Sequence, residues 1–560
     1  MRRLLVPSAL TGALLAVATP AHASVADPMP LGPGGLTETR TVQQVAPGVR
    51  LTIITRGTTD PADAYTVQLA TDATKAQADA DVAKAVTLGA AAATSFPVAR
   101  PLDDPRPGPY AYVVRDGGSY PQSAVSTGLA SFYAQNGFPA AKSVHTSEDG
   151  LTVGHVDTGP WIVQVLEVDP TLAHLDVVKA GDHASGAEKT SSMVARTKAL
   201  AGVNGDFFVN AAGHGTTGDV AGLSVTGGRF HSESIGSQPV LTVRSGVSAL
   251  EELATRMTVA SSDGATTPLL GWDRSVGTIE ACGSNVPGSF SPTDAPRHDT
   301  ACSAADDLVA FDDTWSTSAT PTGSGREVLL DATGTVLSST TTSGQTVPTG
   351  DLVLAGNGTA ASWLATHAPV GAHLLTRVRD LAPDGSEVAL PDAAAGGGPW
   401  LLRHGVPVVR GVADGFAYDA NLEFWHRFGL RRNNRTIIGR RADGTMLLIT
   451  VDGRTPGTSI GATFDEEVAL LQWAGATDGF NADGGGSTTM VVGDGAGAAT
   501  VTNHPTDATG ERAVGEAIVV RPGGAAPTAA VPESPYPPVL LLAGLATAAL
   551  VLRRRSVAAG

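Results

Sequence analysis

The chain has 560 residues, of which 42% are hydrophobic and 16% are charged, and its formal net charge is -17. This length exceeds one ordinary domain, and the apolar share is too large and the charge too sparse for a disordered chain. The acidic balance argues against a nucleic-acid partner, because phosphate backbones require a basic surface. It leaves room for a small phosphorylated ligand held by a few arginines.

Residues 1–23 have the order of a secretory signal peptide. A short basic start precedes the apolar stretch Leu4–Ala18, and small residues at Ala21–Ala23 flank a cleavage point. We therefore expect an exported protein whose mature chain begins near Ser24.

The C-terminal end predicts a membrane anchor. A Pro/Ala-rich linker at 522–538 leads into the apolar run Val539–Leu552, and three arginines follow. The run is shorter than the ~20 residues that cross a bilayer comfortably, but arginines at its end can snorkel. We expect 539–555 to be a C-terminal hydrophobic anchor, a transmembrane helix with a basic tail that keeps the body of the protein at the cell surface. No L-P-x-T-G sortase motif precedes it.

The chain contains two cysteines, Cys282 and Cys302. In an exported protein, two cysteines most simply form one disulfide, and neither has a ligand-like cluster beside it. We predict a Cys282–Cys302 disulfide.

Residues 24–147 predict a small N-terminal α+β module. Two strand–helix units that begin with aromatic, apolar strands suggest a small sheet covered by two helices. The module resembles the SPOR repeat domain, which implies peptidoglycan as a partner; a plain α+β spacer remains the alternative. The strands are Tyr65–Ala70 and Tyr110–Arg115, and the helices are Lys75–Leu88 and Ala124–Asn136.

Residues 151–521 form the expected main domain. Trp161–Val168 alternates as a strand, Leu175–Val178 is a second strand and Thr190–Leu200 a short helix. Residues at about 235–390 contain many short strands and carry no recognisable chemistry. The predicted fold class is α+β: a mixed, largely antiparallel sheet with flanking helices, preceded by the small module.

Three polar segments of this domain follow or precede predicted strands. They are Asn204–Phe208, the pair Asn434–Thr436 and Asp452–Arg454 on two partner strands, and Asn481–Thr489 between a helix and a strand. In the last segment, three successive glycines allow main-chain N–H groups to converge on an anion, helped by the Ser487 and Thr488 hydroxyls. No lysine follows and a strand comes next, so this is not a Walker A loop. A tight glycine turn with a capping Asp is the alternative.

These motifs, in this order, resemble the phosphodiester glycosidase family. The matching set is N-G-D-F-F, G-G-G-P, N-x-R-T-x-x-G, D-G-R, N-x-D-G-G-G-S-T and an E-R pair. The resemblance covers about 150–520, with an insertion at about 235–390, and is densest from Gly396 to Val520. Asn434 stands where the family often has Pro, and Ala482 where it usually has Leu.

The resemblance implies hydrolysis of a sugar-1-phosphodiester, here in cell-envelope glycans. It implies that Arg435 and Arg454, with Arg512 and the glycine segment, hold the phosphate, while three aspartates compete as nucleophile or base. Each aspartate alone also fits a turn cap or an arginine partner. The implied catalytic residues are Asp206, Asp452, Asp483 and Glu511. The implied substrate-binding residues are Asn204, Arg435, Thr436, Arg454, Asn481, Gly484, Gly485, Gly486, Ser487, Thr488 and Arg512.

No cofactor requirement follows from the sequence. The histidines lack metal-ligand spacing, and a divalent ion among Asp452, Asp483 and water stays open. His504 is a candidate for a hydrogen bond to the sugar, against a surface position. Two other functions remain: a non-catalytic envelope protein that binds glycan phosphate, and a phosphodiesterase that cleaves P–O.

Overall fold

A computed structural model describes residues 25, 27–149, 157–211, 213–234, 238–282, 296–316, 318–323 and 325–523. The expected signal peptide, the C-terminal hydrophobic segment and nearly all of the linker lie outside these residues. Within the described part of the chain, no helix is both long and apolar enough to span a bilayer.

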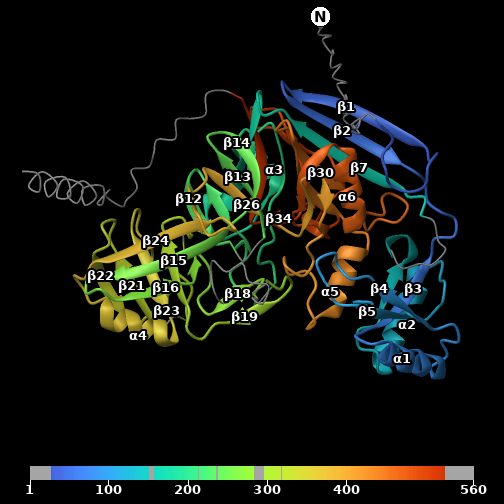
Figure 1. Cartoon of the computed structure of the whole chain (residues 1–560), viewed down its shortest axis with the longest axis horizontal. Coiled ribbons are helices and arrows are strands. Elements are labelled where there is room, and N and C mark those ends of the chain that lie inside the picture. Colours follow the sequence, from blue (N-terminus) through green and yellow to red (C-terminus); the bar gives the residue numbers. More distant parts are fainter. Residues whose placement is uncertain are drawn as a thin grey trace, which may run out of the picture.

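The described chain has three parts, which are distinct in Figure 1. A body of stacked sheets lies between a lobe formed by the middle of the sequence and a small N-terminal module. The strand pairings are antiparallel throughout the described residues, apart from one parallel pair in the lobe. The fold is therefore α+β with mostly antiparallel sheets, as predicted.

The N-terminal module is a four-stranded sheet with two helices on one face. Helix α1 begins at a capping box, in which Thr74 and Gln77 satisfy each other's backbone N–H groups. The other face of the sheet packs into the core of the body through Val98, Tyr110 and Val113. The structure thus has the expected two-helix module, and nothing in it identifies a SPOR domain. The sheet order is β4 (Thr94–Val98), β5 (Ala111–Arg115), β3 (Tyr65–Asp72) and β6 (Lys142–His145), with α1 (Lys75–Thr87) and α2 (Ser123–Gln135).

The first sheet of the body has eight strands. Its first two strands come from residues that the sequence analysis assigned to the N-terminal module, yet they pair with β7. Helix α6 (Phe464–Trp473) covers one face and begins at a Thr463/Glu466 capping box. The strand order is β1 (Glu38–Ala46), β2 (Val49–Arg56), β7 (Trp161–Val168), β30 (Met446–Val451), β29 (Arg435–Arg441), β31 (Ala476–Asn481), β27 (Trp400–Arg403) and β28 (Val406–Pro407).

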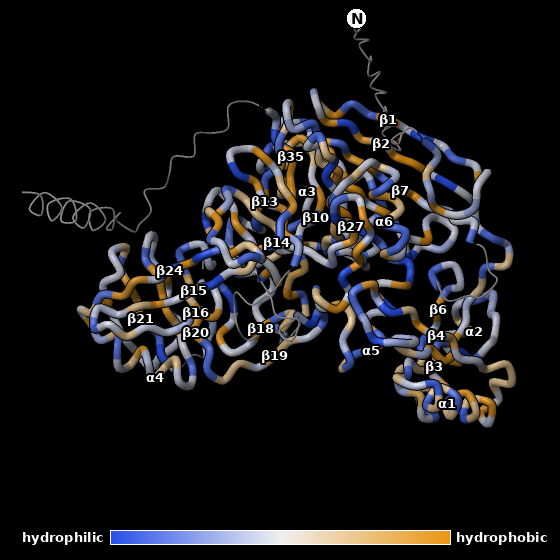
Figure 2. Tube along the Cα trace, in the orientation of Figure 1, coloured by the Kyte–Doolittle hydropathy of each residue, from blue (hydrophilic) through white to orange (hydrophobic). Residues whose placement is uncertain are grey.

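A second sheet packs on the other face of the first. Leu166, Ile438 and Leu448 of the first sheet meet Val203 and Ile518 of the second in one buried cluster. Figure 2 shows apolar residues along the strands of the body, as expected for sheets that are packed on one another. The second sheet runs β33 (Ala499–Val501), β32 (Met490–Gly493), β10 (Ala201–Asn204), β35 (Glu516–Pro522) and β8 (Ala173–Lys179), and α3 (Thr190–Arg196) lies against it.

A third sheet borders the second and leads into the lobe. Its order is β12 (Arg229–Ser232), β11 (Ser224–Thr226), β26 (Ala393–Gly396), β13 (Pro239–Arg244) and β14 (Val247–Glu252). A two-stranded pairing, β34 (Ala513–Val514) with β9 (Glu188–Lys189), closes the body nearby.

The lobe spans β15 to β25 and has its own apolar core, which accounts for most of the expected 235–390 insertion. Its strands are β15 (Ala254–Ser261), β16 (Thr266–Leu269), β17 (Gly271–Trp272), β18 (Thr278–Glu280), β19 (Ala301–Ser303), β20 (Leu308–Asp312), β21 (Arg326–Leu330), β22 (Val336–Thr340), β23 (Leu352–Gly356), β24 (Leu374–Leu381) and β25 (Glu387–Val388), with helix α4 (Gly358–His367).

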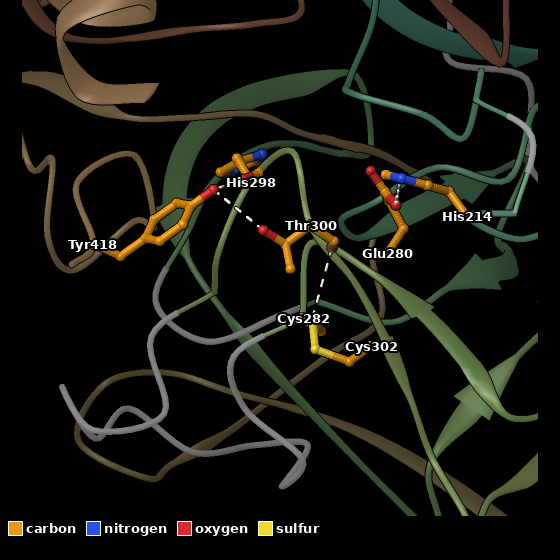
Figure 3. Close-up of a disulfide and its surroundings, with 7 residues drawn as sticks. All are labelled: His214, Glu280, Cys282, His298, Thr300, Cys302 and Tyr418. Atoms are coloured by element: carbon orange, nitrogen blue, oxygen red, sulfur yellow. Dashed lines mark hydrogen bonds and ion pairs between the residues drawn. A yellow bond between two sulfur atoms is a disulfide. The ribbon is translucent and has the colours of Figure 1, made fainter. Parts of the chain in front are cut away.

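The predicted disulfide between Cys282 and Cys302 is present, with Cα atoms 5.7 Å apart. It links Cys302 in β19 to Cys282, which follows the partner strand β18 (Figure 3). There Tyr418 of the body donates to the carbonyl of His298 at 2.6 Å. The disulfide therefore stabilises the edge of the lobe that contacts the body.

Candidate functional site

Two acidic residues follow strands that end at the same edge of the first sheet. Asp452 follows β30 and Asp483 lies two residues beyond β31, while β29 lies between these strands and begins at that edge. A single strand, β29, therefore separates the two strands that lead to the acidic residues. The sheet topology thus brings together motifs that are 31 positions apart in sequence.

The glycine segment carries the chain from the first sheet to the second. It runs from β31 through a short turn, η5 (Gly485–Ser487), into β32. Gly485 has φ +62°, and its N–H donates to the Asn434 carbonyl at 2.9 Å. This left-handed conformation is one that glycine adopts without strain. This segment between β31 and β32, residues 482–489, is called the glycine crossover, and it lies directly against the start of β29.

Two arginines lie against two glycines of the crossover, Gly485 and Gly486. A Cβ at Gly485 would be 3.1 Å from Nη1 of Arg454, and a Cβ at Gly486 would be 2.3 Å from Nη2 of Arg512. The missing side chains are what admit the guanidinium groups. A positive surface therefore forms on the glycine crossover, and it suits a phosphate group.

Both arginines are held by neighbours and remain open to solvent. Arg454, itself in the left-handed region at φ 52°, donates from Nε to Oδ1 of Asn433 at 2.8 Å and is exposed. Arg512 donates from Nε to Asp507 at 2.8 Å and from Nη1 to Oγ of Ser487 at 3.3 Å, and its side chain is 31% exposed. Their remaining N–H groups are available to a ligand.

Asp483 precedes the crossover glycines, is only partly exposed and is close enough to both arginines for their charges to act on it. Its Oδ1 accepts a hydrogen bond from the Gly484 N–H at 2.8 Å. Burial raises the pKa of Asp483 to about 6, against the lowering effects of Ser487, Arg512 and Arg454. A carboxylate with such a pKa is poised to exchange protons or to attack near neutral pH.

The buried polar residues around Asp483 hold the strand ends together. Asn204 donates to the Asp483 carbonyl at 2.6 Å, and its Oδ1 accepts from Thr436 at 2.7 Å and from the Thr489 N–H at 3.2 Å. Asn481 donates to the Gly398 carbonyl at 2.7 Å and so links the end of β31 to the glycine-rich segment between β26 and β27. These contacts position the backbone of the site. Ser487 and Thr488 are also fully buried.

Arg435 lies apart from this surface. Its side chain is completely buried, packs against the rings of Phe428 and Phe464, and pairs with Glu467 at 3.0 Å. Its Nε also donates to the Ala462 carbonyl at 2.9 Å. Burial lowers the pKa of Arg435 and raises that of Glu467. Along β29, side chains alternate between faces, so Arg435 points into the core beneath α6 while Thr436 points between the sheets.

Asp206 is buried at the end of β10, on the second sheet. Its Oδ1 accepts from the Phe207 N–H at 2.7 Å, and its Oδ2 faces the bare backbone of Gly222 and Gly396. Burial, and then the charges of Glu516 and Asp483, raise the pKa of Asp206 well above its usual range. Asp206 is therefore a buried acidic neighbour whose charge acts on Asp483.

Glu511 binds the first turn of α3. Its two carboxylate oxygens accept from the backbone N–H of Ser191 at 2.7 Å and from its hydroxyl at 2.5 Å. An acidic residue at a helix N-terminus is a stabilising cap. Glu511 thus caps helix α3, whereas its neighbour Arg512 reaches the glycine crossover.

Three charged residues near Arg454 belong to none of the motifs identified in the sequence. Arg427 and Arg431, from the segment that contains α5 (Leu422–Trp425) and η4 (His426–Leu430), contribute positive charge close to Arg454, and Glu148 of the N-terminal module contributes negative charge. Glu148 lies 3.6 Å from Arg431, and its carbonyl accepts from the Arg432 N–H at 2.9 Å. The N-terminal module therefore borders the site. Only the density of arginines after Trp425 could have indicated this.

Asp452 is 3% exposed and binds His504, whose side chain is 62% exposed. Their Oδ2 and Nδ1 atoms are 2.8 Å apart. Throughout the described part of the chain, no group of three or more His, Cys, Asp or Glu side chains could hold a metal ion.

Residues 324–521 match the phosphodiester glycosidase family. The chain belongs to this family. The matched residues include 324–390, which the sequence analysis had placed in an insertion, and they contain the glycine crossover, both of its arginines, Asp452 and Asp483. Among curated proteins no match was found.

The chain is similar to several solved structures. A Burkholderia pseudomallei protein, described as a candidate exported protein, is 34% identical, with a TM-score of 0.77 over 90% of this chain and 99% of its own. A Synechocystis protein described as hypothetical is 15% identical, with a TM-score of 0.50 over 87% of this chain and 79% of its own. The catalytic domain of zebrafish N-acetylglucosamine-1-phosphodiester α-N-acetylglucosaminidase, auto-inhibited by its pro-peptide, is 15% identical, with a TM-score of 0.33, and the match covers 64% of this chain and 77% of that domain.

Proposed function

We propose that the protein is an exported hydrolase that cleaves the sugar–oxygen bond of a sugar-1-phosphodiester, of the N-acetylglucosamine-1-phosphodiester kind, in cell-envelope glycans. The observation that carries this proposal is the glycine crossover, where Arg454 and Arg512 lie against Gly485 and Gly486 and their charges act on Asp483. A substrate that joins a sugar to a phosphate needs an anion site and an acidic residue within one ligand's reach.

The chemistry favours cleavage at the sugar. The leaving group is a phosphate monoester, which two arginines stabilise as its charge grows. The anomeric carbon develops oxocarbenium character, which a carboxylate can stabilise or trap. We assign the phosphate to Arg454, Arg512 and the crossover N–H groups, and the reacting carboxylate to Asp483.

The fully buried residues receive supporting functions in this proposal. Asn204, Thr436 and Asn481 position the strand ends. The charge of the buried Asp206 acts on Asp483. Arg435 stabilises the core beneath the site. Glu511 orders α3 and the approach of Arg512.

The cellular setting follows from the predicted signal peptide and from the 34% identical relative described as a candidate exported protein. Fractionation of cells should recover the protein with the envelope, held by the predicted C-terminal anchor. Recovery in the cytosol alone would contradict this part of the proposal.

The activity is tested with the purified full-length protein and an N-acetylglucosamine-α-1-phosphodiester in ¹⁸O-labelled water. The proposal expects free sugar with the label in its hydroxyl, and loss of this product in Asp483→Ala. Label in the phosphate would show a phosphodiesterase that cleaves P–O. Binding of wall polymer that survives Asp483→Ala, without turnover of any sugar phosphodiester, would show a non-catalytic binding protein.

A further inference from the structure

The side chain of Asp452 holds His504 in one orientation. The buried carboxylate accepts from the Asn503 amide at 3.1 Å, from the His504 backbone N–H at 3.1 Å and from His504 Nδ1 at 2.8 Å. A carboxylate can only accept, so the neutral imidazole carries its proton on Nδ1. The lone pair of the neutral ring is then on Nε2, at the outer side of a side chain that is 62% exposed.

The same loop is fastened to the glycine crossover. The Asn503 amide donates to the Thr488 carbonyl at 3.0 Å, and its Oδ1 accepts from the Met490 N–H at 2.8 Å. Asn503 is buried, so these bonds keep the backbone of His504 in register with the crossover. A few residues further along the chain, Asp507 holds Arg512 on the same crossover.

Asp452 and Asp483 follow β30 and β31, the two strands that pair with β29, at the end of the first sheet where β29 begins. The imidazole of His504, held by Asp452, and the Asp483 carboxylate are therefore held beyond the ends of strands on opposite sides of β29.

We propose that His504 is the proton-transfer residue of this site and that Asp452 is its positioning residue. The inference rests on the proposed function. Nε2 of neutral His504 takes a proton from water as the water oxygen bonds to the anomeric carbon. The bond from that carbon to the bridging oxygen breaks, and its electron pair leaves with the phosphate monoester. The imidazolium then passes its proton to the monoester or to solvent, which restores the neutral ring.

A second Asp–His pair in the same chain provides a matched control. His367 Nδ1 lies 2.7 Å from Oδ2 of Asp263 in the lobe. There the carboxylate is 48% exposed and the pair is not joined to the glycine crossover. Local chemistry is similar in the two pairs, so a difference between them reports on the site.

The experiment compares steady-state kinetics of the full-length wild type, His504→Gln, His504→Arg and His367→Gln on the sugar phosphodiester. The inference expects kcat to fall about 100-fold or more in both His504 variants, with KM within about threefold, and no change in His367→Gln. In His504→Gly, added imidazole should restore part of kcat. His504→Arg with wild-type kcat would show that the residue only supplies positive charge, and full activity in His504→Gln would overturn any function in the reaction; either result leaves the proposed function standing.

Nitrogen-15 NMR of the histidine rings gives a second reading that needs no turnover. At alkaline pH, the inference expects the Nδ1–H tautomer for His504 in the wild type, with a shift toward Nε2–H in Asp452→Asn. An Nε2–H tautomer in the wild type would overturn the positioning by Asp452. A folded wild type that turns over no sugar phosphodiester would overturn the proposed function and this inference together.

Discussion

Gly486 and Arg512 are in such close contact that a single methyl group would separate them. A Cβ at position 486 would lie 2.3 Å from Nη2 of the arginine, which also binds Ser487 at 3.3 Å. The absence of a side chain is therefore what lets the guanidinium rest on the crossover.

Gly486→Ala should displace Arg512 and weaken catalysis while the fold persists. Misplacement of a phosphate-binding group by about 1 Å costs on the order of 100-fold in rate, so we expect kcat/KM to fall by about that factor. Steady-state kinetics and thermal unfolding measure both effects. Gly128→Ala is the control: it lies in α2 with open space around its Cβ position. It should raise the unfolding free energy by about 0.5–1 kcal/mol and leave activity unchanged. Wild-type kinetics in Gly486→Ala would contradict the proposed phosphate site.

The reaction should lose rate in acid because of Asp483. Its pKa is raised to about 6, mainly by burial, and the proposed chemistry uses the carboxylate. We therefore expect kcat/KM to fall as pH drops through about 6. A profile that is flat from pH 5 to pH 8 would argue against Asp483 as the reacting group.

The raised pKa of Asp483 also affects the free energy of unfolding, which falls as pH rises, whereas activity rises with pH. Folded Asp483 keeps its proton up to about pH 6, whereas an unfolded aspartate loses it near its usual value of 3.8. The folded state therefore binds more protons between these values, and stability falls as pH rises from about 4 to 6, by up to about 3 kcal/mol from this group. Urea unfolding of Asp483→Asn should show a weaker decline over this range than the wild type does. An identical decline in the two proteins would assign it to other buried carboxyls.

Arg435 should affect stability more than substrate affinity. Arg435→Met leaves Glu467 buried without its partner, which costs about 3–5 kcal/mol, and the double variant Arg435→Met/Glu467→Leu should regain most of this. Denaturant unfolding tests the pair. As a control, Lys75→Met breaks the exposed pair with Asp79 and should cost less than about 1 kcal/mol. A normal unfolding free energy with a strongly raised KM in Arg435→Met would instead place Arg435 on the phosphate.

The disulfide should stabilise the protein by closing a short loop. Cys282 and Cys302 are separated by 20 positions, and the loss of such a cross-link costs about 3 kcal/mol. Reductant should lower the unfolding midpoint of the wild type and leave Cys282→Ser/Cys302→Ser unaffected. An unchanged midpoint of the wild type in reductant would contradict a stabilising cross-link.

Local patterns in the sequence predicted much of this fold and part of its site. The alternation in Trp161–Val168, the two-helix module and the disulfide could be predicted because each depends on neighbours along the chain. The triple-glycine segment could be proposed as an anion site because successive glycines let main-chain N–H groups converge, but the sequence did not distinguish Asp483 from Asp206 and Asp452.

The burial and the partners of the other site residues depend on contacts between strands that are far apart in the sequence. Arg435 and Thr436 are adjacent in sequence, but strand alternation sends one under α6 and the other between the sheets, and only the packing of β29 defines which face is which. Glu148 meets Arg431, and Asp452 meets His504, across long stretches of chain.

The sequence alone therefore indicated the family and the motifs, with their glycines, acids and arginines, from which a candidate anion site could be proposed. The tertiary structure alone decided which arginines face solvent, which acids are buried and which histidine is held by an aspartate. The physical reason is that composition and spacing set local backbone geometry, whereas burial and charge pairing depend on strands that meet only after the sheets have packed.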